Sequence, residues 1–123
     1  MKEKSYFLDS YAIIEILRGN PNYDKFSGAI PFSTRINLVE VAYHLFKSFS
    51  KENALKILDS TKFTALEIQE GQVSKIAIFR KENSRKKFSY IDSIGYVLAK
   101  ENRLRFVTGD KAFEGMPNVE FVK

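Results

Sequence analysis

The sequence predicts an α/β fold in which helices cover both faces of a mainly parallel sheet of four or five strands. Short apolar runs that fit strands alternate along the chain with segments whose apolar residues recur at helical spacing. There is no internal repeat and no low-complexity tract, and a length of 123 residues suits one compact domain spanning residues 1–123. In a sheet of this kind, sites lie at the carboxyl ends of the strands.

The first part of the chain contains two expected strands, each followed by a helix. Residues 6–9 fit a buried strand, and the helix after it ends at the sequence GNPN. Residues 23–29 fit a second short helix. Residues 30–34 fit the next strand, although Pro31 cannot donate a hydrogen bond to a neighbouring strand.

The middle of the chain is expected to be mostly helical. The clearest helix covers residues 37–49, where apolar residues recur at steps of three and four: Leu38, Val41, Ala42, Leu45 and Phe49. Residues 50–60 fit its antiparallel partner, and residues 63–68 fit a short strand or a loop. Residues 72–87 fit a further helix, whose expected core residues are Val73, Ile76 and Ala77.

The last part of the chain repeats the alternation of helix and strand. Residues 89–102 fit a helix, and residues 104–108 and 119–122 fit the last two strands.

The composition limits the chemistry that the chain can perform. There is no cysteine, which excludes disulfides, thiolate chemistry and cysteine-ligated metals, and His44 is the single histidine. A metal site would therefore consist mostly of carboxylates, which select hard cations such as Mg²⁺ or Mn²⁺. No run of 18 or more apolar residues predicts a membrane span, and the start MKEKSYFLDSY lacks the apolar region of a signal peptide, so a cytoplasmic location is expected.

Four acidic residues stand at positions where an acid has an ordinary structural explanation. Asp9 follows a strand and suits a helix N-cap. Glu40 comes three residues after Asn37, and Asp92 three residues after Ser89, as in a capping box. Asp110 follows Gly109 in a turn, where Asp is common.

Together, however, the four acids occupy equivalent places in the expected sheet. Asp9 and Asp110 follow strands, while Glu40 and Asp92 are expected in the first turns of helices that start at the same edge. Four carboxylates at one edge repel each other, and a divalent cation requires oxygen ligands that converge in this way. Gly95 and Ala99, at helical spacing after Asp92, indicate either room for a metal and a phosphate or close packing of the helix on the sheet.

A basic segment accounts for much of the net charge of +5. The sequence RKENSRKK, residues 80–87, contains five basic residues and one acid. It fits a surface that binds a phosphate backbone, or equally a solvated helix end where cations are favoured. The candidate RNA-binding residues are Arg80, Lys81, Arg85, Lys86 and Lys87.

Three blocks of the sequence resemble the PIN domain, the metal-dependent nuclease fold, and in particular its small VapC-type toxins. They are YFLDSYAII, NLVEVAYHL and YIDSIGYVLAKENRLRFVTGDKAF, in the order found in the family. The resemblance implies a three-layer α/β/α sandwich. It also implies an acidic quartet of Asp9, Glu40, Asp92 and Asp110 as catalytic residues and metal ligands, with Thr108 and Ser10 as polar helpers. Glu114 is either an outer acid of this site or a surface acid, and His44 is expected to be a surface or packing residue.

The resemblance implies endoribonuclease activity with Mg²⁺ or Mn²⁺, an RNA substrate (tRNA, rRNA or mRNA), a cognate antitoxin protein and a homodimer. Three alternatives differ from this reading. One is an RNA-processing PIN nuclease outside any toxin pair, and another is a non-catalytic module that binds RNA or protein through the basic segment. The third, a receiver-type phosphoacceptor domain, requires paired acids after the first strand, where FLDSY offers one.

Overall fold

A five-stranded parallel sheet forms the centre of the computed structural model, which describes residues 5–123. The strands are β1 (Ser5–Leu8), β2 (Ile30–Ser33), β3 (Thr64–Ala65), β4 (Arg105–Thr108) and β5 (Val119–Phe121). Their order is β3-β2-β1-β4-β5, and every neighbouring pair is parallel. The carboxyl ends of all strands therefore meet at one edge, as the sequence predicted. Residues 1–4, which belong to the expected charged start, lie outside the described residues.

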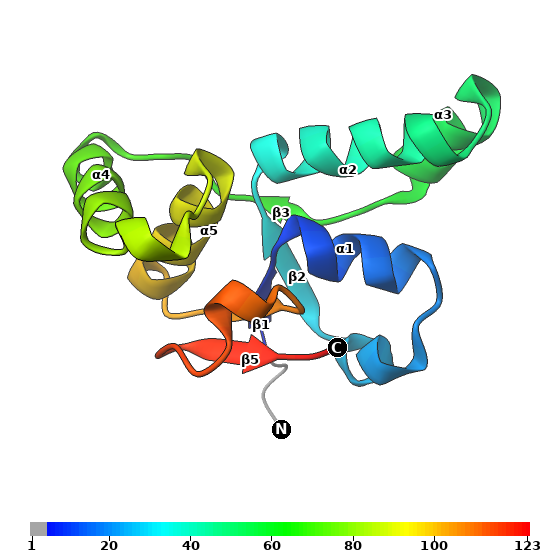
Figure 1. Ribbon diagram of the computed structural model, residues 1–123. Coiled ribbons are helices and arrows are strands. Elements are labelled where there is room, and N and C mark those ends of the chain that lie inside the picture. Colours follow the sequence, from blue (N-terminus) through cyan, green and yellow to red (C-terminus); the bar gives the residue numbers. More distant parts are fainter. Residues whose placement is uncertain (1–4) are drawn as a thin grey trace.

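Helices cover both faces of the sheet, which confirms the predicted three-layer α/β/α arrangement. Figure 1 shows α1, α2 and α3 on one side of the strands and α4 and α5 on the other. Their bounds are α1 (Ser10–Leu17), α2 (Arg35–Ser48), α3 (Lys51–Ser60), α4 (Val73–Glu82) and α5 (Tyr90–Glu101). Four short 3-10 helices complete the chain: η1 (Pro21–Phe26), η2 (Glu70–Gln72), η3 (Ser84–Lys86) and η4 (Lys111–Phe113). No helix within residues 5–123 is long and apolar enough to span a membrane.

Alternate residues of the central strands build the two cores. Leu8 and Val107 face the side of α1–α3, where they join Ala12 of α1 and Val41 of α2 in one buried cluster. Phe7 and Phe106 face the other side and pack with aromatic residues that include Phe88, Tyr96 and Phe113. This division follows from the strand geometry, in which successive side chains point to opposite faces.

The structure corrects two helix boundaries. Helix α2 begins at Arg35 instead of residue 37, because the Thr34 hydroxyl accepts a hydrogen bond from Asn37 N–H at 3.0 Å and serves as the N-cap. Glu40 therefore lies in the second turn of α2, and its predicted capping box with Asn37 is wrong. The expected helix over 72–87 ends at Glu82, because the Asn83 side chain donates to the carbonyl of Phe79 at 2.9 Å and the backbone then turns into η3.

Three side chains that were expected in the core lie at the surface, and one strand contains a proline. Phe49, Val73 and Ala77 are exposed, whereas Ile76 is buried as predicted. Pro31 lies within β2, but β3 pairs only with Phe32 and Ser33. The side of Pro31 that faces β3 therefore has no ladder bond to lose.

Candidate active site at the carboxyl edge of the sheet

Asp9 connects the end of β1 to the start of α1. One of its carboxylate oxygens accepts a hydrogen bond from Ala12 N–H at 2.8 Å, so Asp9 is the N-cap of α1, and its own N–H donates to the Val107 carbonyl at 3.2 Å. The side chain is buried, with only 5% of the residue's surface exposed. A carboxylate is thus held in a dry position between the two central strands.

The surroundings of Asp9 oppose its ionisation. Burial, reinforced by the negative charges of Asp92 and Asp110, raises the pKa of Asp9 from 3.8 to about 7. Hydrogen bonds from the Thr108 hydroxyl and Ala12 N–H act in the opposite direction but are weaker. Asp92 and Asp110, which are far from Asp9 in the sequence, therefore both lie close enough to act on its carboxyl group.

Thr108 links Asp9 to Asp110. It is fully buried at the end of β4, where its hydroxyl donates to the Asp9 carboxylate and accepts from Asp110 N–H at 3.0 Å. Asp110 in turn accepts from Ala112 N–H at 3.0 Å and caps η4. Gly109 has no space for a larger residue, because an added Cβ atom would lie 2.6 Å from the Val122 carbonyl oxygen. Sequence reasoning missed this requirement for glycine.

Asp92 forms a capping box at the start of α5. Its carboxylate accepts from Ser89 N–H at 2.9 Å, and its own N–H donates to the Ser89 hydroxyl at 3.0 Å. Phe88 precedes this box and stacks on Phe113 with ring centroids 4.3 Å apart. Since Phe113 follows Asp110 by three residues, this aromatic contact holds the start of α5 against η4, and with it the two acids.

Glu40 joins the site through a chain of hydrogen bonds. The Ser10 hydroxyl donates to the Glu40 carboxylate at 2.6 Å, and the Asn37 side-chain amide donates to the Ser10 oxygen at 2.9 Å. The Thr34 hydroxyl donates to the side-chain carbonyl oxygen of Asn37 at 2.6 Å. Ser10, the residue that follows Asp9, therefore orients the exposed side chain of Glu40. Asn37 is buried within this series of hydrogen bonds but was not among the predicted site residues. The feature of the sequence that could have indicated it is a polar side chain among the repeating apolar residues of this helix.

The donor set suits a hard divalent cation. Among residues 5–123, none of the four carboxylates forms an ion pair with Lys or Arg. The aspartates each direct an oxygen to a backbone N–H, and in the described part of the chain no three Asp, Glu or His side chains lie close enough to hold one metal ion together. Carboxylates without a cationic partner nevertheless match the ligands that Mg²⁺ and Mn²⁺ take.

The small residues of α5 serve packing rather than space for a ligand. A Cβ atom on Gly95 would lie 3.0 Å from the Phe7 ring, and Ala99 is fully buried in the same aromatic core. Of the two interpretations of this face, the structure supports close packing of the helix on the sheet. Glu114 is exposed after η4, and His44 lies 3.2 Å from the guanidinium of Arg18, the C-cap of α1, away from the quartet's hydrogen bonds.

The five candidate basic residues divide into two sets. Arg80, Lys81 and Lys87 line one surface pocket. Lys86 instead donates to the carbonyl of Ala112 at 3.0 Å, which ties η3 to η4, and Arg85 is exposed outside the pocket.

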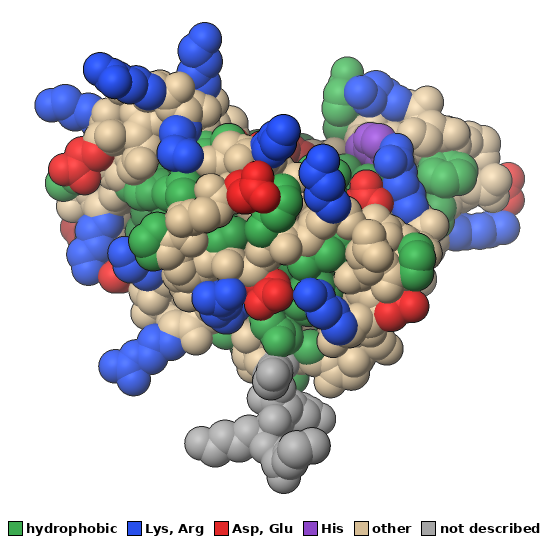
Figure 2. Space-filling model, turned by 60° about the horizontal axis from the view of Figure 1, so that its bottom comes forward, with side chains coloured by type: hydrophobic (Ala, Val, Ile, Leu, Met, Phe, Trp, Pro, Cys, Tyr) green, Lys and Arg blue, Asp and Glu red, His purple; other side chains and the backbone are tan. Residues whose placement is uncertain are grey.

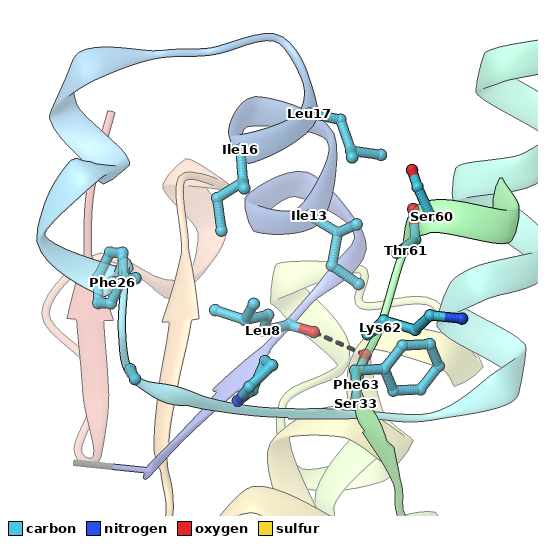
Figure 3. A pocket seen from close by; sticks show the side chains of 12 residues that line it. Leu8, Ile13, Ile16, Leu17, Phe26, Ser33, Ser60, Thr61, Lys62 and Phe63 are labelled. Atoms are coloured by element: carbon cyan, nitrogen blue, oxygen red, sulfur yellow. Dashed lines mark hydrogen bonds between the residues drawn. The ribbon is translucent and has the colours of Figure 1, made fainter. Parts of the chain in front are cut away.

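A separate pocket of about 240 Å³ lies between α1, β2 and the segment after α3 (Figure 3). Its walls are mostly apolar and include Ile13, Ile16 and Phe26, and the Ser33 hydroxyl at its floor donates to the Leu8 carbonyl at 2.7 Å. No acidic residue lines it. This pocket is therefore distinct from the acidic site.

Comparisons with known proteins agree with the fold described above. The model of the PIN domain family matches residues 6–119. A toxin–antitoxin complex from Klebsiella pneumoniae is similar, with 20% identity, coverage of 94% of this chain and 95% of that chain, and a TM-score of 0.72. VapBC2 from Rickettsia felis, bound to a DNA fragment from their promoter, has 19% identity, coverage of 97% and 99%, and a TM-score of 0.76. PAE2754 from Pyrobaculum aerophilum has 15% identity, coverage of 98% and 92%, and a TM-score of 0.67. A comparison with curated protein sequences gave no match.

Proposed function

The chain belongs to the PIN domain family, and from this premise we propose that it is an Mg²⁺- or Mn²⁺-dependent endoribonuclease that hydrolyses phosphodiester bonds in RNA. The observation that carries the proposal is the group formed by Asp9, Asp92 and Asp110. At the carboxyl edge of the sheet Asp92 and Asp110 both act on the Asp9 carboxyl, and none of the three acids has a cationic partner among residues 5–123. Such a group gains most from a divalent cation.

The acidic quartet would hold the cation. Asp9 and Asp92 would be its main ligands, and Asp110 and Glu40, the latter oriented by Ser10, would contribute directly or through water. When bound, the cation would activate water and offset charge on the scissile phosphate. The protein's own groups prepare this site. Thr108 joins Asp9 to Asp110 by its hydroxyl, and the caps of α1, α5 and η4 fix one oxygen of each aspartate.

We further propose that the chain is the toxin of a VapBC-type toxin–antitoxin pair. Two of the similar structures are toxin–antitoxin assemblies, which supports this proposal. It entails a cognate antitoxin as a partner, a homodimer, a cytoplasmic location and a single PIN domain over residues 1–123. Coexpression with the protein encoded next to it would test the pairing, since an antitoxin should copurify with the chain and suppress its activity.

Cleavage of labelled tRNA and total RNA by the purified chain tests the proposed reaction. We expect cutting with Mg²⁺ or Mn²⁺ and none with excess chelator, because carboxylates alone supply neither the activated water nor the positive charge. Cleavage that persists unchanged in chelator would contradict the metal-dependent mechanism. RNA binding without any cleavage under all conditions would favour a non-catalytic binding module.

Thr108→Val should lower cleavage by about 10- to 100-fold, the usual cost of removing a group that orients a metal ligand. Valine retains the shape of threonine but cannot donate to Asp9 or accept from Asp110 N–H. Thr108→Ser keeps the hydroxyl and should retain most of the activity. The measurement is single-turnover cleavage over a range of Mg²⁺ concentrations. Equal activity in the two variants would show that the hydroxyl does not orient the acids.

A further inference from the structure

A basic pocket lies between α4 and the start of α5. It has a volume of about 330 Å³ and is lined by Arg80, Lys81, Ser84, Lys87, Phe88 and Tyr90. Three of these side chains are cations, no lining residue is acidic, and none of the three cations forms an ion pair within residues 5–123. Elsewhere Lys and Arg are interspersed with acids, as on the face seen in Figure 2. The pocket therefore attracts an anion.

An aromatic ring gives the pocket a second kind of recognition. The Arg80 guanidinium lies over the Tyr90 ring, 4.1 Å from its centroid, and Arg80 Nε donates to the Phe88 carbonyl at 3.0 Å. These contacts fix the position of the guanidinium. Tyr90 is nevertheless 63% exposed, so much of its ring remains available for stacking. A planar group and a phosphate can be bound side by side here.

The pocket adjoins the acidic site through the backbone. Phe88 and Tyr90 flank Ser89, whose N–H donates to the Asp92 carboxylate. The carbonyl that Arg80 binds thus lies in the residue just before the capping box of Asp92. Ser89 therefore connects the two places, because its N–H binds the Asp92 carboxylate and both of its chain neighbours line the pocket.

We propose that this pocket binds one nucleotide of single-stranded RNA beside the scissile phosphate. Its base stacks on Tyr90, and a phosphate is held by Arg80, Lys81 and Lys87. The proposal rests on the proposed nuclease function for its choice of RNA, and it assigns two residues of the basic segment, Arg85 and Lys86, no part in the pocket.

Binding of a short fluorescein-labelled single-stranded RNA of mixed sequence, measured in chelator by fluorescence anisotropy, tests the pocket without cleavage. Tyr90→Ala should weaken binding by about 5- to 100-fold, as loss of base stacking does, while Tyr90→Phe should bind like the wild type. Arg80→Ala should make the negative slope of log K against log salt shallower by about 0.7, the value for one phosphate contact on a single strand, whereas Tyr90→Ala should leave the slope unchanged.

Tyr43→Ala is the matched control, because Tyr43 is 66% exposed and carries the Lys47 ammonium over its ring on α2. This variant should bind RNA like the wild type. Inorganic polyphosphate provides the second probe, and its binding should be weakened by Arg80→Ala but not by Tyr90→Ala. If the Tyr90→Ala and Arg80→Ala variants both bind RNA like the wild type, the proposal is overturned. An acidic protein segment would then be the better candidate for the pocket.

The binding assay also separates this proposal from the nuclease function. The expected losses in a chain that never cuts RNA would support the pocket and overturn the proposed reaction. Metal-dependent cutting by a chain whose Tyr90→Ala and Arg80→Ala variants bind and cut RNA normally would overturn the pocket alone.

Discussion

Replacing Asp92 by Asn is expected to lower RNA cleavage by about a thousandfold or more while leaving the fold intact. Asparagine retains a carbonyl oxygen that can accept from Ser89 N–H, so the start of α5 should remain capped. It lacks the negative charge that holds a divalent cation. A thousandfold loss corresponds to about 4 kcal/mol of transition-state stabilisation. The measurement is single-turnover cleavage with Mg²⁺, accompanied by thermal unfolding followed by circular dichroism.

Glu52→Gln provides the control for loss of an acid near a helix start. Glu52 lies in the first turn of α3, exposed, with its carboxylate 3.5 Å from the Lys56 ammonium. Its replacement should leave cleavage unchanged, because an exposed ion pair contributes little and the residue is remote from the acidic site. Normal cleavage by a folded Asp92→Asn variant would reduce Asp92 to a capping residue and remove it from the proposed site.

Capping and metal binding are compatible roles for the same aspartates. Asp9, Asp92 and Asp110 each use one carboxylate oxygen to satisfy a backbone N–H at the start of a helix. A carboxylate has two oxygens, so the cap fixes its direction without using all of its acceptor capacity. The N-termini of helices also carry partial positive charge, which favours the ionised acids. The capping interpretation of Asp9 and Asp92 is therefore correct, Asp110 is a cap as well, and these roles do not compete with a shared site.

The fold could be predicted from alternation, but the strand order could not. Apolar runs and helical spacing located four strands and the five longer helices, and they left residues 63–68, which contain β3, as a short strand or a loop. Nothing local in β1 indicates that it pairs with both β2 and β4, because that pairing depends on the path of whole helices between strands. The start of α2 was wrong because Thr34 and Asn37 are both competent caps three residues apart. The choice between them depends on a distant contact, in which the Asn37 amide donates to Ser10.

Three of the candidate acids could be assigned to one edge of the sheet from the sequence, because Asp9 and Asp110 follow strands and Asp92 lies in the first turn of a helix. The groups that support them were less predictable. Asn37 and Gly109 act through partners far along the chain, namely Ser10 and the Val122 carbonyl. The sequence does not distinguish Tyr90 from any other exposed aromatic residue, because the contact of the Arg80 guanidinium with its ring depends on the fold. The charge of the basic segment predicted one RNA-binding set of five residues, whereas the structure shows that three of them share a pocket.

Asp9→Asn is expected to stabilise the metal-free chain at pH 8 but not at pH 4. The pKa of Asp9 is raised by burial from 3.8 to about 7. Between these pH values the folded chain keeps a proton that the unfolded chain has released, so the free energy of unfolding falls as the pH rises. Above pH 7 the wild type should have lost up to about 4 kcal/mol through this residue. Asparagine, an equally good N-cap, does not ionise and avoids this loss.

The difference in unfolding free energy between wild type and Asp9→Asn, measured in urea from pH 4 to pH 8, isolates the Asp9 contribution. Adding Mg²⁺ or Mn²⁺ at pH 8 should stabilise the wild type, by about 2.7 kcal/mol at a hundred times the dissociation constant, and the variant much less. A difference that does not vary with pH would mean that Asp9 ionises as freely in the folded chain as in the unfolded one. A pH-dependent difference without any response to metal would support the raised pKa of Asp9 but argue against cation binding at the site. The two readouts need no RNA, so they test the acidic site independently of its substrate.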